Sequence, residues 1–276
     1  GIPKEGSVQL RWTVTNTYDR AHNLSCPHSS EISVTNHYFD VDPGPAADMT
    51  PCGTTADQYQ FAAILKPSNN KYKYEGRWTN GNFGAGDIET PTSNTSKVTG
   101  LLNSESNEFV WTVTKYENQK AADTDPDNWV QVCQNHANVV ITNPMPTKPS
   151  ITSPSNDYAT CNSDAQLMAT APNTQMHESG YWTMKAGLKS QGFFGETSLN
   201  ENSTNNSVKV TNMGTDDNYY TWVVKRELTT AMGYPRDITC EDEATVKVWN
   251  LGVKANIPVE ADFTCDGKYN LSAQNF

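Results

Sequence analysis

The spacing of the cysteines constrains the fold of this chain more than any other feature. Cys26, Cys133 and Cys240 follow one another at a constant interval of 107 residues. Behind each cysteine, at six, eight and ten residues, stand two β-branched residues and an asparagine. These are Ile32, Val34 and Asn36, then Val139, Ile141 and Asn143, and then Val246, Val248 and Asn250. Three copies in register indicate a tandem array of one kind of domain.

A second series of cysteines lies between the members of the first. Cys52, Cys161 and Cys265 are separated by 109 and 104 residues, so each complete repeat carries one early and one late cysteine. This order predicts two disulfides, Cys52–Cys133 and Cys161–Cys240. Paired cysteines are typical of an oxidising compartment, so we expect an exported protein.

The same two series predict the domain boundaries. We expect residues 1–41 to be the C-terminal part of a repeat, 42–147 and 148–251 to be complete repeats, and 252–276 to begin a further one. An alternative is that 252–276 completes 1–41 of a neighbouring molecule by strand donation. The two pieces together hold about 66 residues and lack the middle of a repeat. A segment of a longer array is therefore the preferred interpretation.

Alternating apolar residues predict strands. Leu10, Trp12 and Val14 share one face of a strand, and the same pattern recurs around Trp111 and Trp222. Earlier in each complete repeat a second tryptophan strand follows a glycine, at Gly76-Arg-Trp78 and Gly180-Tyr-Trp182. Because these tryptophans recur in phase, we predict a core that contains Trp12, Trp78, Trp111, Trp182 and Trp222.

About seven short strands in each repeat, without a helical stripe, predict an all-β fold. The size fits tandem immunoglobulin-like β-sandwiches, each with one disulfide. Proline-rich joints such as Asn143-Pro-Met-Pro-Thr-Lys-Pro149 favour extended linkers, so we expect neighbouring domains to sit end to end.

The chain also resembles a known family. An early Cys, a Gly-x-Trp strand, Val98-Thr-Gly-Leu101, Phe109-Val-Trp-Thr-Val-Thr114 and a late Cys resemble the PKD-like and Ig-like repeats of giant Bacteroidetes surface proteins. This group includes the gliding-motility adhesins exported by type IX secretion. The second copy departs from the motif at Val210-Thr-Asn-Met213. The resemblance implies a surface location and a repeat architecture, and neighbouring repeats, surface polysaccharide or other adhesin chains as partners.

Charge and composition exclude several other functions. The formal net charge is −11, without a cluster of basic residues, which argues against nucleic acid as a partner. No apolar stretch is long enough for a membrane span. The five histidines do not recur at equivalent positions, and we find no acid, base or nucleophile set, so we predict no enzyme and no cofactor.

Two local features suggest binding. Asp123, Asp125 and Asp127 alternate in one loop and could bind Ca²⁺; the other interpretation is a solvated acidic loop. Trp129 and Trp249 have no aromatic counterpart in the other copies, which makes them candidates for surface contacts. The sequence thus predicts a non-catalytic spacer segment of a long extracellular adhesin or filament. The alternative is a glycan-binding or accessory module of a secreted protein.

Overall fold

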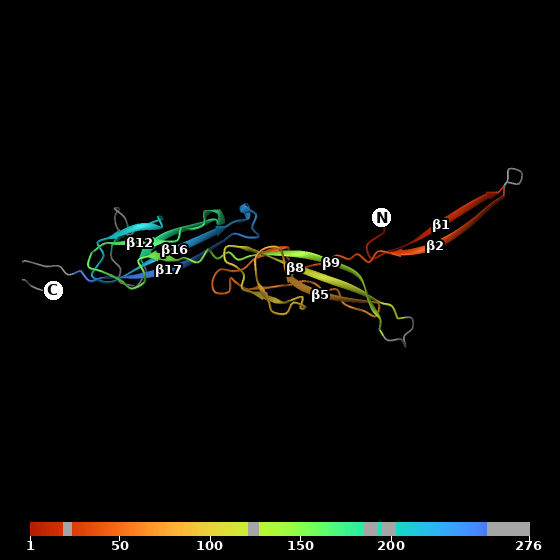
Figure 1. Cartoon of the computed structure of the whole chain (residues 1–276), viewed down its shortest axis with the longest axis horizontal. Helices are drawn as coiled ribbons and strands as arrows, with labels where there is room; N and C mark the ends of the chain where they lie inside the picture. Colours follow the sequence, from red (N-terminus) through yellow and green to blue (C-terminus); the bar gives the residue numbers. More distant parts are fainter. Residues whose placement is uncertain (19–23, 121–126, 185–191, 195–202, 253–276) are drawn as a thin grey trace, which may run out of the picture. The chain divides into compact units, whose positions relative to one another are not determined.

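The structure is a computed structural model that describes residues 1–18, 24–120, 127–184, 192–194 and 203–252. Strands dominate these residues, and the helical elements are two 3₁₀ turns, η1 (Thr174–Met176) and η2 (Thr230–Met232). The chain divides into two compact units (Figure 1). Unit 1 comprises 1–50 and 57–143, and unit 2 comprises 51–56 and the chain from 144 onward. The predicted all-β fold of tandem β-sandwiches is confirmed.

The first sandwich, in unit 1, has two sheets. One has the order β3-β9-β8-β5 and the other the order β4-β7-β6. The strands are β3 (Ala47–Met49), β4 (Tyr59–Gln60), β5 (Tyr72–Asn80), β6 (Asp87–Ile88), β7 (Lys97–Thr99), β8 (Ser106–Asn118) and β9 (Trp129–Thr142). β8 and β9 form a long antiparallel hairpin, and β3 pairs with the far end of β9 in parallel.

The second sandwich, in unit 2, repeats this plan. Its sheets have the orders β11-β17-β16-β13 and β10-β12-β15-β14. The strands are β10 (Ile151–Ser153), β11 (Tyr158–Thr160), β12 (Ala165–Ala169), β13 (Glu178–Met184), β14 (Phe193–Phe194), β15 (Ser207–Thr211), β16 (Asp216–Leu228) and β17 (Ile238–Asn250). Again the last two strands form the long hairpin, and β11 pairs with β17 in parallel.

Each sandwich is built on a pair of tryptophans that face one another across two strands. Trp78 of β5 pairs with Trp111 of β8, and Trp182 of β13 pairs with Trp222 of β16. All four side chains are buried, as predicted, and their rings lie 4.9 Å and 5.3 Å apart within each pair. Two-residue alternation turns these rings toward the facing sheet, so each repeat has its own core.

The glycine before each of these strand tryptophans has a packing role. A Cβ atom added at Gly76 would overlap the indole ring of Trp111, and one added at Gly180 would overlap the ring of Trp222. Only glycine lets the two strands carry a large ring at this register. The Gly-x-Trp motif is therefore part of the core packing.

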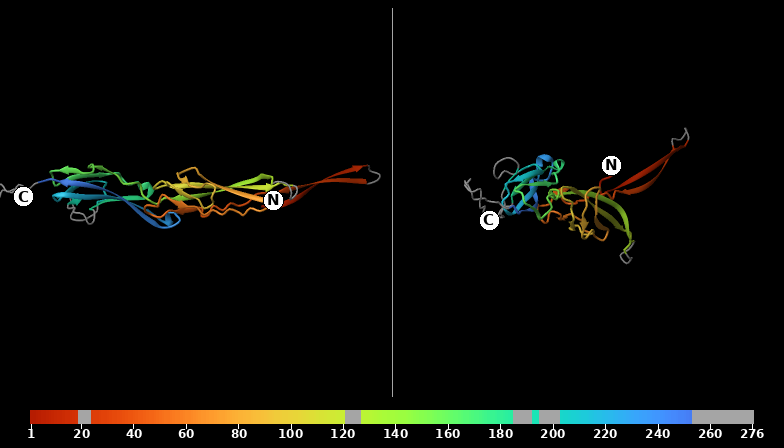
Figure 2. Two further views of the ribbon diagram at one scale, coloured as in Figure 1. Left: turned by 90° about the horizontal axis from the view of Figure 1, so that it is seen from below. Right: turned by 60° about the vertical axis from the view of Figure 1, so that its left-hand side comes forward.

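A third hairpin precedes the first sandwich. β1 (Ser7–Tyr18) and β2 (Leu24–Thr35) pair along their whole length as a two-stranded sheet, drawn in red (Figure 1, Figure 2). The register is that of the other two hairpins, because Leu10 lies opposite Ile32 as Phe109 lies opposite Val139. In the described part of the chain, no further strand pairs with this sheet.

The prediction that Trp12 belongs to a core is wrong for this structure. Its side chain is 74% exposed, and its neighbours on the same face, Leu10, Val14 and Ile32, are also exposed. Strand pattern and register match those of the buried tryptophans, but the hairpin has no facing sheet among the described residues. Burial here depends on the partner sheet and cannot be read from the hairpin alone.

The predicted disulfides are also wrong. Cys52 bonds Cys240, and Cys133 and Cys161 are free. The parallel pairing explains why. Met49 of β3 lies opposite Thr142, so the chain reaches Cys52 at the end of β9, whereas Cys133 is nine residues back along that strand. At 3.3 Å per residue, Cys133 and Thr142 are about 30 Å apart along β9, and a disulfide spans less than about 7 Å between Cα atoms.

Candidate functional site

The disulfide is the most distinctive chemical feature of the described chain. Cys52 lies in the loop 51–56, which follows β3 but belongs to unit 2, and Cys240 is the buried third residue of β17. Their Cα atoms are 5.5 Å apart. The loop has further contacts in unit 2, because the backbone N–H of Gly53 donates to Met145 Sδ at 3.3 Å. The N–H of Ala56 donates to the carbonyl of Gly53 and closes a turn.

Three free cysteines are found among the described residues. Cys26 and Cys161 are exposed, and Cys133 is half-buried. Cys161 follows β11 as Cys52 follows β3, whereas Cys133 lies near the start of β9 as Cys240 lies near the start of β17. Cys265, the sixth cysteine, lies outside the described residues. The free thiols therefore occupy the same two kinds of position as the bonded pair.

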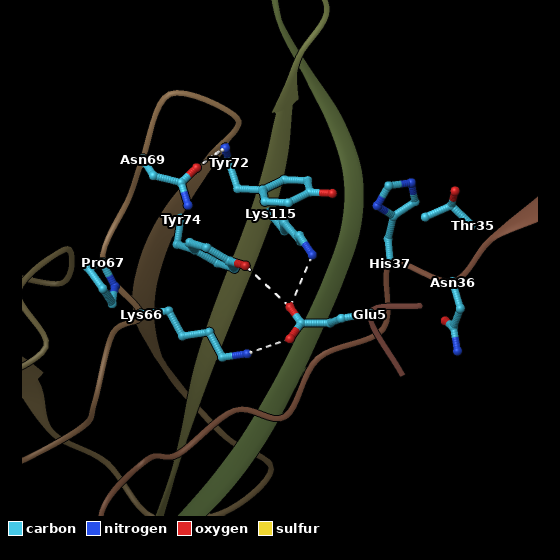
Figure 3. Close-up of a pocket in the computed structure, with 10 residues that line it drawn as sticks. All are labelled: Glu5, Thr35, Asn36, His37, Lys66, Pro67, Asn69, Tyr72, Tyr74 and Lys115. Carbon is cyan, nitrogen blue, oxygen red and sulfur yellow. Dashed lines mark hydrogen bonds and ion pairs between the residues drawn. The ribbon is translucent and has the colours of Figure 1, made fainter. Parts of the chain in front are cut away.

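A pocket of about 340 Å³ lies in unit 1, between the segment that leads into β1 and the strands β5 and β8 (Figure 3). The carboxylate of Glu5 lies at its centre. Lys115 Nζ donates to Glu5 Oε1 and Lys66 Nζ to Glu5 Oε2, both at 3.1 Å, and the Tyr74 hydroxyl donates to Oε1 at 3.4 Å. Figure 3 draws these three interactions as dashed lines that meet at the Glu5 carboxylate.

Electrostatics in this pocket favour the ion pair. Burial acts to raise the pKa of Glu5, but hydrogen bonds from Lys66 and Lys115 outweigh it, so the pKa lies below its ordinary value. Burial acts in the opposite direction on Lys115 and is outweighed by the Glu5 bond and by nearby tyrosines, which raises the pKa of Lys115. The Lys115 ammonium also lies 4.2 Å from the centre of the Tyr72 ring. The charges lining the pocket thus have partners within the chain, as expected of a structural anchor.

Both sandwiches bury a basic side chain on the long hairpin, directly opposite the late cysteine. Lys115 lies opposite Cys133, and Arg226 lies opposite Cys240. The Arg226 side chain donates from Nε to the carbonyl of Met176 at 3.0 Å and faces Glu178 on the neighbouring strand. Sequence reasoning missed these residues because a basic residue in a strand is typical of the solvent face. Their equivalent positions, four residues after a strand tryptophan, were the available signal.

The predicted calcium ligands are only partly described. Asp123 and Asp125 lie outside the described residues. Asp127 is exposed, accepts a hydrogen bond from Asn118 Nδ2 at 2.8 Å, and lies 3.8 Å from Lys120 Nζ. No cluster of three potential metal ligands occurs among the residues that the structure describes. Calcium binding by Asp123, Asp125 and Asp127 stays a prediction.

The two tryptophans proposed for surface contacts differ in exposure. Trp129, at the start of β9, is half-buried, and Trp249, near the end of β17, is 40% exposed. The ammonium group of Lys247 lies 4.3 Å from the centre of the Trp249 ring and 3.1 Å from Asp217. One face of this ring is therefore covered by a cation.

No helix in the described chain is long and apolar enough to cross a membrane. No protein-family profile matches the sequence. No curated protein matches it either.

Comparison with solved structures finds weak similarity to proteins from several sources. Mouse Protocadherin-24 EC1-3 has a TM-score of 0.30 at 12% identity, over 87% of this chain and 78% of that chain. Mouse Cadherin-23 EC22-24 has a TM-score of 0.33 at 12% identity, over 81% and 69%. A SusE-like surface located polysaccharide binding protein from the Bacteroides thetaiotaomicron heparin utilisation locus has a TM-score of 0.31 at 8% identity, over 82% of this chain and 37% of that chain. Likeness at this level carries no residue roles across.

Proposed function

We propose that this chain is a non-catalytic segment of a long extracellular adhesin or surface filament, in which the sandwiches serve as spacers. The finer assignment, to the surface adhesins of Bacteroidetes that include gliding-motility and type IX secretion proteins, rests on the resemblance of the repeat motif. Neighbouring repeats of the same chain are the direct partners. Surface polysaccharide or other adhesin chains are partners of the whole molecule.

The observation that carries the proposal is the position of the disulfide in the chain. Cys52 and Cys240 are 188 residues apart, and the strands from β4 to β16 all lie inside the loop that they close. A force applied to the two chain ends passes through the sulfur–sulfur bond and bypasses this loop. Each sandwich core can then open without adding its length to the chain, which is useful in a spacer that must keep its extension.

Pulling single molecules by their termini tests this function. With the disulfide intact, the residues between Cys52 and Cys240 should not extend. Reduction should release 188 residues and add roughly 620–680 Å of contour length, at 3.3–3.6 Å per residue. The Cys133→Ser variant is the matched control and should behave as the unmodified chain. Equal contour lengths before and after reduction would contradict the proposal.

The alternative, a glycan-binding or accessory module, has one observation in its favour. Trp249 is an exposed aromatic residue on a β-sandwich, and such rings can stack on sugars. Lys247 already occupies one face of the ring. For this reason we prefer the spacer function.

A further inference from the structure

We propose that the free cysteines belong to a staggered series of disulfides, in which the early cysteine of each repeat bonds the late cysteine of the repeat that follows. An early cysteine is one that follows the short parallel strand, as Cys52 and Cys161 do. A late cysteine is one near the start of the last strand, as Cys26, Cys133 and Cys240 are. The proposal rests on the proposed function in one respect, since it requires a longer array in an oxidising compartment.

The first argument is that a bond within one repeat is geometrically excluded. In the first sandwich, Met49 pairs with Thr142, nine residues beyond Cys133. In the second, Thr160 pairs with Asn250, ten residues beyond Cys240. Early and late cysteines of one repeat thus lie at opposite ends of the last strand, about 30 Å apart. Both sandwiches have the same parallel pairing, so the exclusion is a property of the repeat.

The second argument is that the observed bond has the proposed register. Cys52 is the early cysteine in the sequence of the first complete repeat, and Cys240 is the late cysteine of the second. The strand contexts of the free cysteines match those of the bonded ones. In particular, Cys133 lies opposite the buried Lys115 in the hairpin, as Cys240 lies opposite the buried Arg226.

The third argument is that the stagger accounts for every free thiol of the described chain. Cys161 requires a late cysteine from a following repeat, and Cys133 and Cys26 require early cysteines from preceding repeats. Cys133 is the late cysteine of the first complete repeat, and Cys161 is the early cysteine of the second. The proposed bond joins an early cysteine to a late cysteine that follows it in the chain, so these two do not bond each other. Cys26, Cys133 and Cys161 are therefore free because the repeats that would supply their partners are not among the described residues.

Each bond forms by thiol–disulfide exchange. The thiolate of one cysteine attacks the disulfide of a thiol–disulfide oxidoreductase, and the thiolate of the second cysteine then attacks the mixed disulfide. The new sulfur–sulfur bond leaves two electrons on the oxidoreductase, which departs as a dithiol carrying the two protons. The half-buried Cys133 and the exposed Cys26 and Cys161 can be reached from solvent for this step.

A tandem duplication tests the register. The variant is the full chain with residues 144–250 repeated once after Asn250, because this stretch is one repeat length and keeps an Asn-Pro junction. A Thr239→Ser change in the second copy makes its cysteine peptide distinguishable by mass. We expect peptide mapping without reductant to find Cys161 of the first copy joined to the Cys240 position of the second copy. The bond from Cys52 to Cys240 of the first copy should persist.

The control is the same duplicated chain with Cys161→Ser in the first copy, in which the second-copy cysteine at position 240 should become a free thiol. Circular dichroism shows whether each variant keeps its strands. Cys161 bonded within its own copy, or free in the folded duplicated chain, would overturn the stagger. The pulling experiment concerns the Cys52–Cys240 bond alone, so a failure of the spacer function would be recognised separately.

Discussion

At the scale of single residues, the tryptophans show how much of burial depends on context. Trp12 and Trp111 stand in strands with the same alternation and the same hairpin register, yet Trp12 is 74% exposed and Trp111 is fully buried. The difference comes from the neighbours. Trp111 is covered by the opposite sheet and by Trp78, whereas Trp12 has no facing sheet among the described residues.

This contrast gives a prediction for two matched substitutions. Trp111→Ala should lower the free energy of unfolding by about 3–5 kcal/mol, since it empties part of a closed core. Trp12→Ala should change it by less than about 0.5 kcal/mol, as expected of an exposed side chain. Urea unfolding followed by circular dichroism measures both. A large loss for Trp12→Ala would show that the apolar face of the hairpin is covered in solution.

Sequence reasoning predicts some of these residues well and others poorly. The four buried tryptophans follow from recurrence in phase, because a core position is set mainly by strand alternation. Lys115 and Arg226 are not predictable in this way, because a buried cation needs a partner that is distant in sequence. Glu5, which pairs with Lys115, precedes it by 110 residues.

At the scale of elements, the long hairpins are the part of the fold that the sequence predicts best. All three hairpins have the same alternation of apolar residues, and in all three the tryptophan and the late cysteine occupy equivalent positions. The short parallel strands β3 and β11, of three residues each, carry no clear pattern. They nevertheless fix the position of each early cysteine, at the opposite end of the sandwich from the late one. This is why the sequence predicts two kinds of cysteine correctly but pairs them wrongly.

The segment before β1 provides a prediction on pH. Glu5 joins this segment to Lys66 and to Lys115 of β8. Because the pKa of Glu5 is lowered in the folded protein, its carboxylate stabilises the fold above the ordinary pKa of a glutamate. This contribution should disappear as the pH falls through the lowered value.

Glu5→Gln should therefore remove part of the loss of stability on acidification, and at neutral pH it should loosen the segment before β1. Amide hydrogen exchange of residues 4–8 and thermal melts between neutral and acidic pH measure the two effects. Glu31→Gln is the control, because the Glu31 side chain is exposed and its pair with Arg11, at 3.9 Å, is remote from the pocket. A Glu5→Gln variant with the pH profile of the unmodified chain would contradict the role of this carboxylate.

At the scale of the whole molecule, the disulfide does not respect the boundaries of the sequence repeats. The chain contains two sandwiches with separate cores, but its one disulfide among the described cysteines joins residues from the two sequence repeats. The loop 51–56 shows the same pattern, since it lies between β3 and β4 in sequence and belongs to unit 2 in space. Repeat counting predicts a tandem of β-sandwiches, whereas the disulfide connections require the three-dimensional register of each strand.

Removal of this disulfide should lower the stability of the fold, because the bond closes a long loop. In the chain-entropy model, closing 188 residues stabilises the folded state by up to about 5 kcal/mol. Cys52→Ser should lower the urea midpoint of unit 2, and reductant should lower the midpoint of the unmodified chain to the same level. The buried Cys240 thiol left behind is tolerated as a small apolar group. Cys133→Ser should keep both the midpoint and the sensitivity to reductant of the unmodified chain. If Cys133→Ser lost that sensitivity and Cys52→Ser kept it, Cys133 would be in the bond that stabilises the fold, and the pairing of Cys52 with Cys240 would be incorrect.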